Sequence, residues 1–221
     1  MDLMDRIDAL IDRRHLLGHP FYRAWVAGTL PTDALREYAR QYYAFESSFP
    51  RFLSAIHSRS DQPDVRDALL ENLWDEEHGA ANHQEMWLRF AEGMGVPRDD
   101  VRGAQWNQAT QTLVRTYWDA AREADVPSAV AAVYAYERQV PAVAQAKIAG
   151  LRERYGVADR RTLGFFETHA ELDVEHSEAE RRIIADGANG QAEDALRWTD
   201  RALDAWWGFL DAVTPEGSAQ A

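Results

Sequence analysis

Apolar residues recur every three to four positions along almost the whole chain, and this spacing constrains the fold more than any other feature. It places the apolar side chains on one face of an α-helix. No stretch of more than a few residues alternates between apolar and polar, and no Asn-Gly or Asp-Gly pair joins two apolar runs as in a β-hairpin. The sequence therefore predicts an all-α fold. The expected helices span residues 2–16, 20–28, 32–58, 63–92, 106–123, 127–154, 160–185 and 191–213.

Helix starts are well marked, and nothing divides the chain into parts. The segment 31–33 (Pro-Thr-Asp) precedes one expected helix and Asp159 precedes another, as is typical of helix N-termini. Connections are short, and the chain has neither an interdomain linker nor a repeat of fixed period. We therefore expect a single compact bundle of seven to eight helices over residues 1–213. The small polar residues 214–221 predict a disordered tail.

The charge balance and the absence of cysteine exclude several classes of protein. Acidic residues outnumber basic ones by 37 to 24, giving a net charge of −13, so we expect no nucleic-acid partner. Without cysteine there is no disulfide framework, thiolate metal site or cysteine nucleophile. The N-terminus is not a signal peptide, and the longest apolar run, Val126 to Tyr136, is too short to span a bilayer. We expect a cytoplasmic protein with no membrane partner.

Charged residues interrupt the apolar stripes of two long expected helices. Glu76 and His83 are seven residues apart, so on one ideal helix they share the apolar face. Glu137 lies at the centre of the stripe of 127–154, and Pro141, four residues later, cannot donate a hydrogen bond to its carbonyl, so we expect a kink. Such groups need a partner, because an unpaired buried charge is costly. A metal ion would be one partner, and a hydrogen-bonded polar pair or a chance pattern is the simpler interpretation.

A third helix carries the strongest cluster. His169, Asp173 and His176 are offset by four and seven residues, which places all three on one face. Together, three carboxylates and three imidazoles would supply three ligands to each of two ions, and such ligands without sulfur suit iron or manganese. So few protein ligands would leave positions open to dioxygen. The six predicted metal ligands are Glu76, His83, Glu137, His169, Asp173 and His176.

Several motifs along the chain resemble those of one known superfamily. They include His19-Pro20-Phe21-Tyr22, Asp75-Glu76-Glu77 with Asn82-His83, Tyr134-x-Tyr136-Glu137-x-Gln139-x-Pro141 and His169-x3-Asp173-Val174-x-His176. This is the haem-oxygenase-like superfamily, which also contains thiaminases and the pyrroloquinoline-quinone synthase. Within it, the chain resembles the family of the chlamydial death-domain-associating protein and its bacterial relatives over about residues 3–212. The resemblance implies a haem-oxygenase-like helical bundle, and the family's metal ligands match the six residues predicted above.

The resemblance also implies an activity. These relatives are dimetal oxygenases that make 4-aminobenzoate, a folate precursor, in a self-sacrificing reaction. A tyrosine of the protein supplies the aromatic ring and matches Tyr22, and the lysine proposed as the nitrogen source matches Lys147. Tyr38 and Tyr136 match tyrosines along the radical or substrate path, whereas Phe165 stands where a relative has tyrosine, so no radical role is assigned there. Two metal ions (Fe/Fe or Mn/Fe), dioxygen as co-substrate, an external reductant and a homodimer are implied.

The lysine content gives an independent indication. Lys147 is the only lysine, and the other 23 basic residues are arginine. Arginine stays protonated in proteins, whereas a lysine amine can become a nucleophile or nitrogen donor when its pKa falls. Chance survival on an exposed helix is the simpler interpretation, and one ideal helix would place Lys147 about 15 Å from Glu137. Tyr22 likewise has a simpler interpretation as a core aromatic residue.

Two other functions stay open at this stage. A related dimetal oxygenase acting on an external small molecule, by amine N-oxygenation or oxidative decarboxylation of a fatty acid, would share the six ligands but need a substrate cavity. A helical interaction module with a structural metal or a buried polar network would have no enzymatic activity. A thiaminase is disfavoured, since that branch relies on a cysteine and this chain has none.

Overall fold

The computed structural model describes residues 1–188 and 190–215 and confirms the all-α fold. These residues form twelve α-helices and one 3₁₀ turn, more helices than the seven to eight expected, and no β-strand. None of the helices among them is long and apolar enough to cross a membrane. Most of the predicted tail, residues 216–221, lies outside the described residues. The elements are α1 (Leu3–Arg13), η1 (Leu16–Gly18), α2 (Pro20–Ala27), α3 (Thr32–Glu46), α4 (Phe49–His57), α5 (Pro63–Glu77), α6 (His83–Gly93), α7 (Arg98–Arg102), α8 (Gln108–Glu123), α9 (Val126–Glu137), α10 (Val140–Arg154), α11 (Arg160–Gly187) and α12 (Ala192–Val213).

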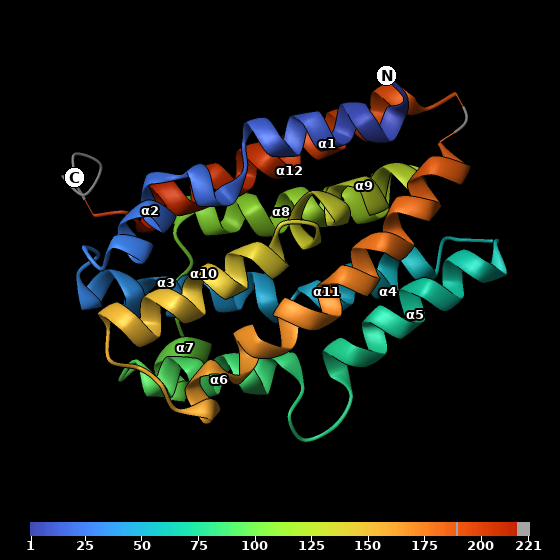
Figure 1. The fold of residues 1–221 in the computed structure, drawn as a ribbon. Coiled ribbons are helices and arrows are strands. Elements are labelled where there is room, and N and C mark those ends of the chain that lie inside the picture. Colours follow the sequence, from blue (N-terminus) through green and yellow to red (C-terminus); the bar gives the residue numbers. More distant parts are fainter. Residues whose placement is uncertain (189, 216–221) are drawn as a thin grey trace.

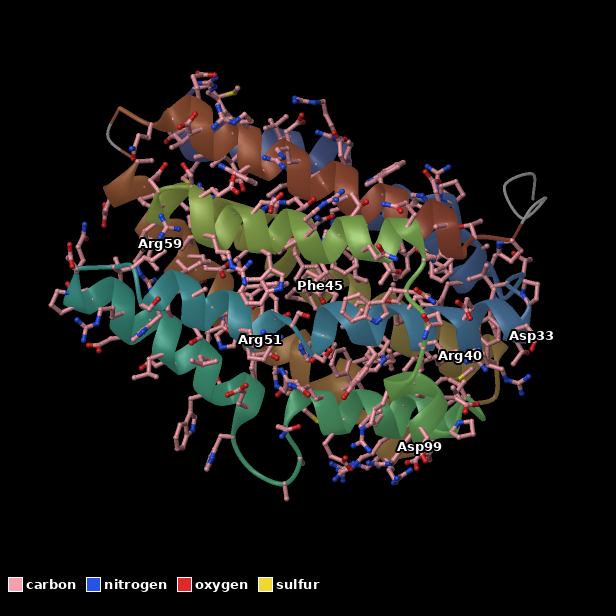
Figure 2. All side chains as sticks on the ribbon, turned by 180° about the vertical axis from the view of Figure 1, so that it is seen from behind. Asp33, Arg40, Phe45, Arg51, Arg59 and Asp99 are labelled. Carbon is pink, nitrogen blue, oxygen red and sulfur yellow. The ribbon has the colours of Figure 1, made fainter. Side chains whose placement is uncertain are left out.

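The helices pack into one bundle around an aromatic core. The long helix α11 packs against α6, α9 and α10, while α12 lies along α8 and α9 (Figure 1). Figure 2 shows the opposite side, where Asp33 and Asp99 lie on the outside and Phe45 points between the helices. Trp25, Trp87 and Phe45 are almost completely buried. Burying one phenylalanine side chain contributes about 2 kcal/mol, so such residues hold the helices together.

Two prolines divide helices that the sequence predicts as continuous. A proline cannot donate to the carbonyl four residues earlier, and its ring clashes with it. Helix α3 ends at Glu46, four residues before Pro50, and helix α9 ends at Glu137, four residues before Pro141. The kink expected at Pro141 is therefore a full break between α9 and α10, whereas the prediction of one helix over 32–58 is wrong for the same physical reason.

The helix expected over 63–92 is also divided, and this changes how two predicted ligands are held. Helix α5 ends at Glu77, the chain turns through Gly79 at a φ of 86°, and Asn82 caps α6 by accepting a hydrogen bond from the backbone of Glu85. A positive φ favours glycine, which lacks a Cβ. The prediction that Glu76 and His83 share one helical face is therefore wrong. Glu76 lies at the end of α5, and His83 is the first residue of α6.

Candidate metal centre and tyrosine cluster

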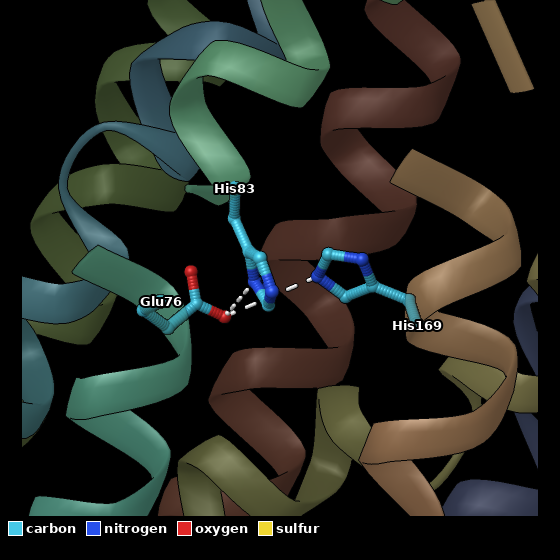
Figure 3. A group of neighbouring side chains, drawn as sticks. All are labelled: Glu76, His83 and His169. Atoms are coloured by element: carbon cyan, nitrogen blue, oxygen red, sulfur yellow. Dashed lines mark ion pairs between the residues drawn. The ribbon is translucent and has the colours of Figure 1, made fainter. Parts of the chain in front are cut away.

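All six predicted ligands are buried and meet in the core, although they come from four helices. They form two groups of three, and within each group one ligand atom per residue lies within 4.8 Å of the others. Helix α11 contributes to both groups, so it joins them. Figure 3 shows the first group at the junction of α5, α6 and α11. The first group is Glu76, His83 and His169, and the second is Glu137, Asp173 and His176.

In the first group, both imidazoles face one carboxylate. Nδ1 of His83 lies 2.8 Å from Oε1 of Glu76, and Nε2 of His169 lies 3.9 Å from the same oxygen (Figure 3). Nδ1 of His169 donates a hydrogen bond of 2.7 Å to the backbone carbonyl of Phe165, which leaves Nε2 as the ligand atom. Burial, and then the nearby charge of His83, lower the pKa of His169 well below its usual range. The neutral imidazole is the form that binds metal ions.

In the second group, one imidazole faces two carboxylates. Nδ1 of His176 lies 3.8 Å from Oδ1 of Asp173 and 4.0 Å from Oε1 of Glu137. Asn72 on α5 donates to both carboxylate oxygens of Glu137, at 3.0 and 3.1 Å. Burial, and then the neighbouring Glu137, raise the pKa of Asp173 well above its usual range. A group with this much carboxylate repulsion is stabilised by a cation.

The ligand atoms fit a pair of metal ions. Oε2 of Glu76, Nδ1 of His83, Oδ2 of Asp173 and Nδ1 of His176 are buried without a hydrogen-bond partner among the described residues, because the close contact of His83 with Oε1 of Glu76 lacks hydrogen-bond geometry. Buried polar atoms normally have partners, so four such atoms in one place indicate that something else binds them. Imidazole and carboxylate donors, three per group, suit iron or manganese and not a thiolate-preferring metal.

Two buried carboxylates at this site escaped the sequence analysis. Glu46, the last residue of α3, and Glu180, one helical turn beyond His176, are each 3% exposed. Burial raises the pKa of both, and the charges of Glu76 and Glu137 respectively add to the effect. The spacing of Glu180 from His176 was a readable signal, since four residues continue the same helical face. Glu46 lies eight residues after the predicted Tyr38, so it also continues a buried helical face.

The predicted tyrosines and the lysine lie together beside the metal ligands. The hydroxyls of Tyr22 and Tyr38 are 3.1 Å apart, and Nζ of Lys147 donates to the Tyr38 hydroxyl at 2.8 Å. Lys147 is therefore not on an exposed surface, because the break before α10 turns its helix away from the line of α9. Burial lowers the pKa of Lys147 to about 7, against the opposing charge of Glu46. Its amine can thus lose its proton near neutral pH.

The fourth predicted residue, Tyr136, lies next to a tyrosine that the sequence analysis missed. The hydroxyls of Tyr136 and Tyr42 are in hydrogen-bond contact, and the ring of Tyr42 packs 5.4 Å from that of Tyr38. Tyr42 therefore connects Tyr136 to the cluster of Tyr22 and Lys147. Its spacing of four residues from Tyr38 on α3 places both rings on one face, which the sequence could have indicated.

A small enclosed cavity joins the tyrosine cluster to the metal ligands. Tyr22, Tyr136, Lys147 and His169 all contribute to its wall. It leaves about 10 Å³ for a water-sized molecule, which is about the space of one water molecule. A separate aromatic substrate does not fit there.

Comparisons with known proteins agree on one family. Residues 36–207 match the family described as iron-containing redox enzyme. The 4-aminobenzoate synthase of Nitrosomonas europaea is 40% identical, over 94% of this chain and 89% of the relative. The 4-aminobenzoate synthase of Chlamydia trachomatis is 34% identical, over 99% of this chain and 94% of the relative. A haem-oxygenase-like domain of unknown function from Shewanella denitrificans superposes with a TM-score of 0.80 at 17% identity, covering 96% of this chain and 92% of the other, which shows the fold.

Proposed function

The chain belongs to the haem-oxygenase-like family of iron-containing redox enzymes, and from this premise we propose that it is a 4-aminobenzoate synthase that takes the aromatic ring from its own Tyr22. Relatives named 4-aminobenzoate synthase, similar over nearly their whole length, support the product. They do not identify the source of the ring, so that part of the proposal depends on the site itself.

The observation that carries the proposal is the enclosed cavity between His169 and Tyr22. With about 10 Å³ free, it has no room for an external phenol, and the aromatic rings that line it, Tyr22 among them, belong to the protein. Tyr22 is 2% exposed, and its hydroxyl is held by Tyr38. Burial raises its pKa, so the phenol keeps its proton until the reaction removes it.

Two metal ions would be held by the two groups of ligands, as Fe/Fe or Mn/Fe. When bound, they supply the activation of dioxygen with electrons from an external reductant. Glu76, His83 and His169 would hold one ion, and the second group the other. The six side chains that would hold them are buried, so electrostatic interactions with bound ions would be strong.

The remaining residues would bind, orient and move protons. The product retains the ring and Cβ of Tyr22, so the Cα–Cβ bond breaks, Cβ is oxidised to the carboxylate with dioxygen as oxidant, and nitrogen replaces the phenolic oxygen. Lys147, with a pKa near 7, would provide that nitrogen as a neutral amine. Nζ would bond to the ring carbon as the phenolic oxygen leaves as water, and the Cε–Nζ bond would break as Cε is oxidised to an aldehyde, with dioxygen as the oxidant. Tyr38 hydrogen-bonds both groups and so aligns the amine with the ring. Tyr136 would pass an electron or a proton through Tyr42.

Intact-mass analysis tests the proposal. Metal-free protein is loaded with iron, or with manganese and iron, and incubated in air with a reductant. We expect 4-aminobenzoate in the filtrate, at no more than one per chain, and a mass loss that peptide mapping places at Tyr22. Tyr22→Phe should bind metal normally and release no 4-aminobenzoate. An oxygenase acting on an external small molecule would survive this change and turn over repeatedly, and that result would overturn the proposal.

A further inference from the structure

One carboxylate outside both ligand groups contacts a predicted ligand directly. Oδ2 of Asp75, on α5, lies 3.1 Å from Nε2 of His176 on α11, 101 residues away in the chain. A carboxylate accepts, so Nε2 of His176 carries the proton and Nδ1 is free to bind a cation. That Nδ1 is the atom that faces Asp173 and Glu137. The bond therefore fixes both the tautomer and the direction of this ring.

The other two imidazoles are oriented differently. His169 donates to the carbonyl of Phe165, a backbone group that no substitution removes. His83 begins α6, and its Nδ1 faces Glu76, which is itself a proposed ligand. Among these three imidazoles, His176 alone is hydrogen-bonded to a side chain outside the ligand groups.

Asp75 also lies where the second group approaches the surface. A groove between α5 and α11 is lined by Asp75 and His176, and by none of the other five predicted ligands. The side chain of His176 is 9% exposed, compared with 2% for His83 and 5% for His169. Because the ring of His176 borders a groove and has fewer neighbours to hold it, it depends more on a specific hydrogen bond.

We infer that Asp75 is the positioning residue of the second metal group, and that its hydrogen bond holds His176 in the orientation that binds the ion. This inference rests on the two-metal site proposed above. It predicts a selective effect: loss of the Asp75 carboxylate weakens the binding of one ion and leaves the ion held by Glu76, His83 and His169 unchanged. Outer carboxylates of this kind contribute about 10- to 100-fold to metal affinity.

Cobalt titration of the metal-free full chain tests the inference without the oxidation reaction. Co²⁺ takes similar ligands to Fe²⁺, and its visible absorption reports coordination. We expect wild type to bind two ions, and Asp75→Ala to bind one ion normally and the other about 10- to 100-fold more weakly. Asp75→Asn retains an oxygen that can accept from Nε2 of His176, so its affinity should lie between the two. Glu71→Ala is the matched control, because it removes a carboxylate of the same groove one helical turn earlier.

Each contrary result has a distinct meaning. Equal binding of both ions by wild type and Asp75→Ala would overturn the inference, as would an equal loss at both groups. A loss in Glu71→Ala as large as in Asp75→Ala would show that the charge of the groove acts in place of the hydrogen bond, and would also overturn it. Urea unfolding of the metal-free variants checks that the fold is intact. Wild type that binds no metal would overturn the proposed function itself.

Discussion

Replacing Lys147 by methionine tests whether its buried amine is neutral. The pKa of Lys147 falls from an ordinary 10.5 to about 7 in the folded protein because of burial. Between these values the unfolded chain holds one more proton than the folded one, so this residue makes stability rise with pH, by about 1.4 kcal/mol per pH unit. Burial of this amine destabilises the folded protein by about 5 kcal/mol below about pH 7, and this destabilisation disappears above about pH 10.5.

Lys147→Met removes this cost while keeping a side chain of similar length. The variant should be more stable than wild type near pH 7.5, and its advantage should shrink by about 3 kcal/mol by pH 9.5. The hydrogen bond to Tyr38 and the added apolar contact change little between these pH values, so the pH dependence of the difference isolates the amine. Urea unfolding of both proteins in chelator, followed by circular dichroism, measures it. A stability difference that does not change with pH would show that the amine is protonated in the fold, and the argument for Lys147 as a nitrogen donor would be refuted.

Two further predictions concern the metal ions and the packing of α2 against α10. Chelation should lower the thermal midpoint of the metal-loaded protein, because an ion at 100 times its Kd stabilises by about 2.7 kcal/mol; an unchanged midpoint in differential scanning calorimetry would contradict the metal site. Gly150→Ala should destabilise the protein by about 1–3 kcal/mol, since the new Cβ would lie 2.7 Å from Cδ1 of Trp25. A Cβ at Gly164 would meet no atom within 4 Å, so Gly164→Ala should stabilise the protein slightly. Urea midpoints that shift in the same direction for both variants would show that α2 and α10 do not depend on this close approach.

Helical periodicity predicted which side chains meet in the core better than it predicted where the helices begin and end. It selected the six predicted ligands because each is a polar residue on an apolar stripe, and the structure brings them together in two buried groups. For His169, Asp173 and His176 the reasoning matches the structure, since all three lie on one unbroken helix. For Glu76 and His83 the shared face does not exist, and a turn at Gly79 brings the two side chains together instead.

Glu180 and Tyr42 could have been predicted from helical spacing, whereas other features of the site depend on contacts between distant segments. Asp75 lies next to Glu76 in sequence, yet its partner His176 is 101 residues away, and no local pattern reports that distance. The position of Lys147 was also beyond reach. Its uniqueness was visible, but its approach to Tyr38 depends on the direction that α10 takes after the break at Arg138 and Gln139.

Three helix ends add to the negative charge of this core. Glu46 and Glu137 are the last residues of α3 and α9, and Glu76 is the penultimate residue of α5. A helix C-terminus carries about half a negative charge, which disfavours a nearby carboxylate. Pro50 and Pro141 create two of these ends inside the protein, where water cannot screen the charge. Three helix ends and their glutamates thus add to one negative potential, and Lys147, whose pKa burial lowers to about 7, offsets it only in part at neutral pH. The fold therefore sets a negative potential where the two proposed metal ions would bind, beside Tyr22 and Lys147.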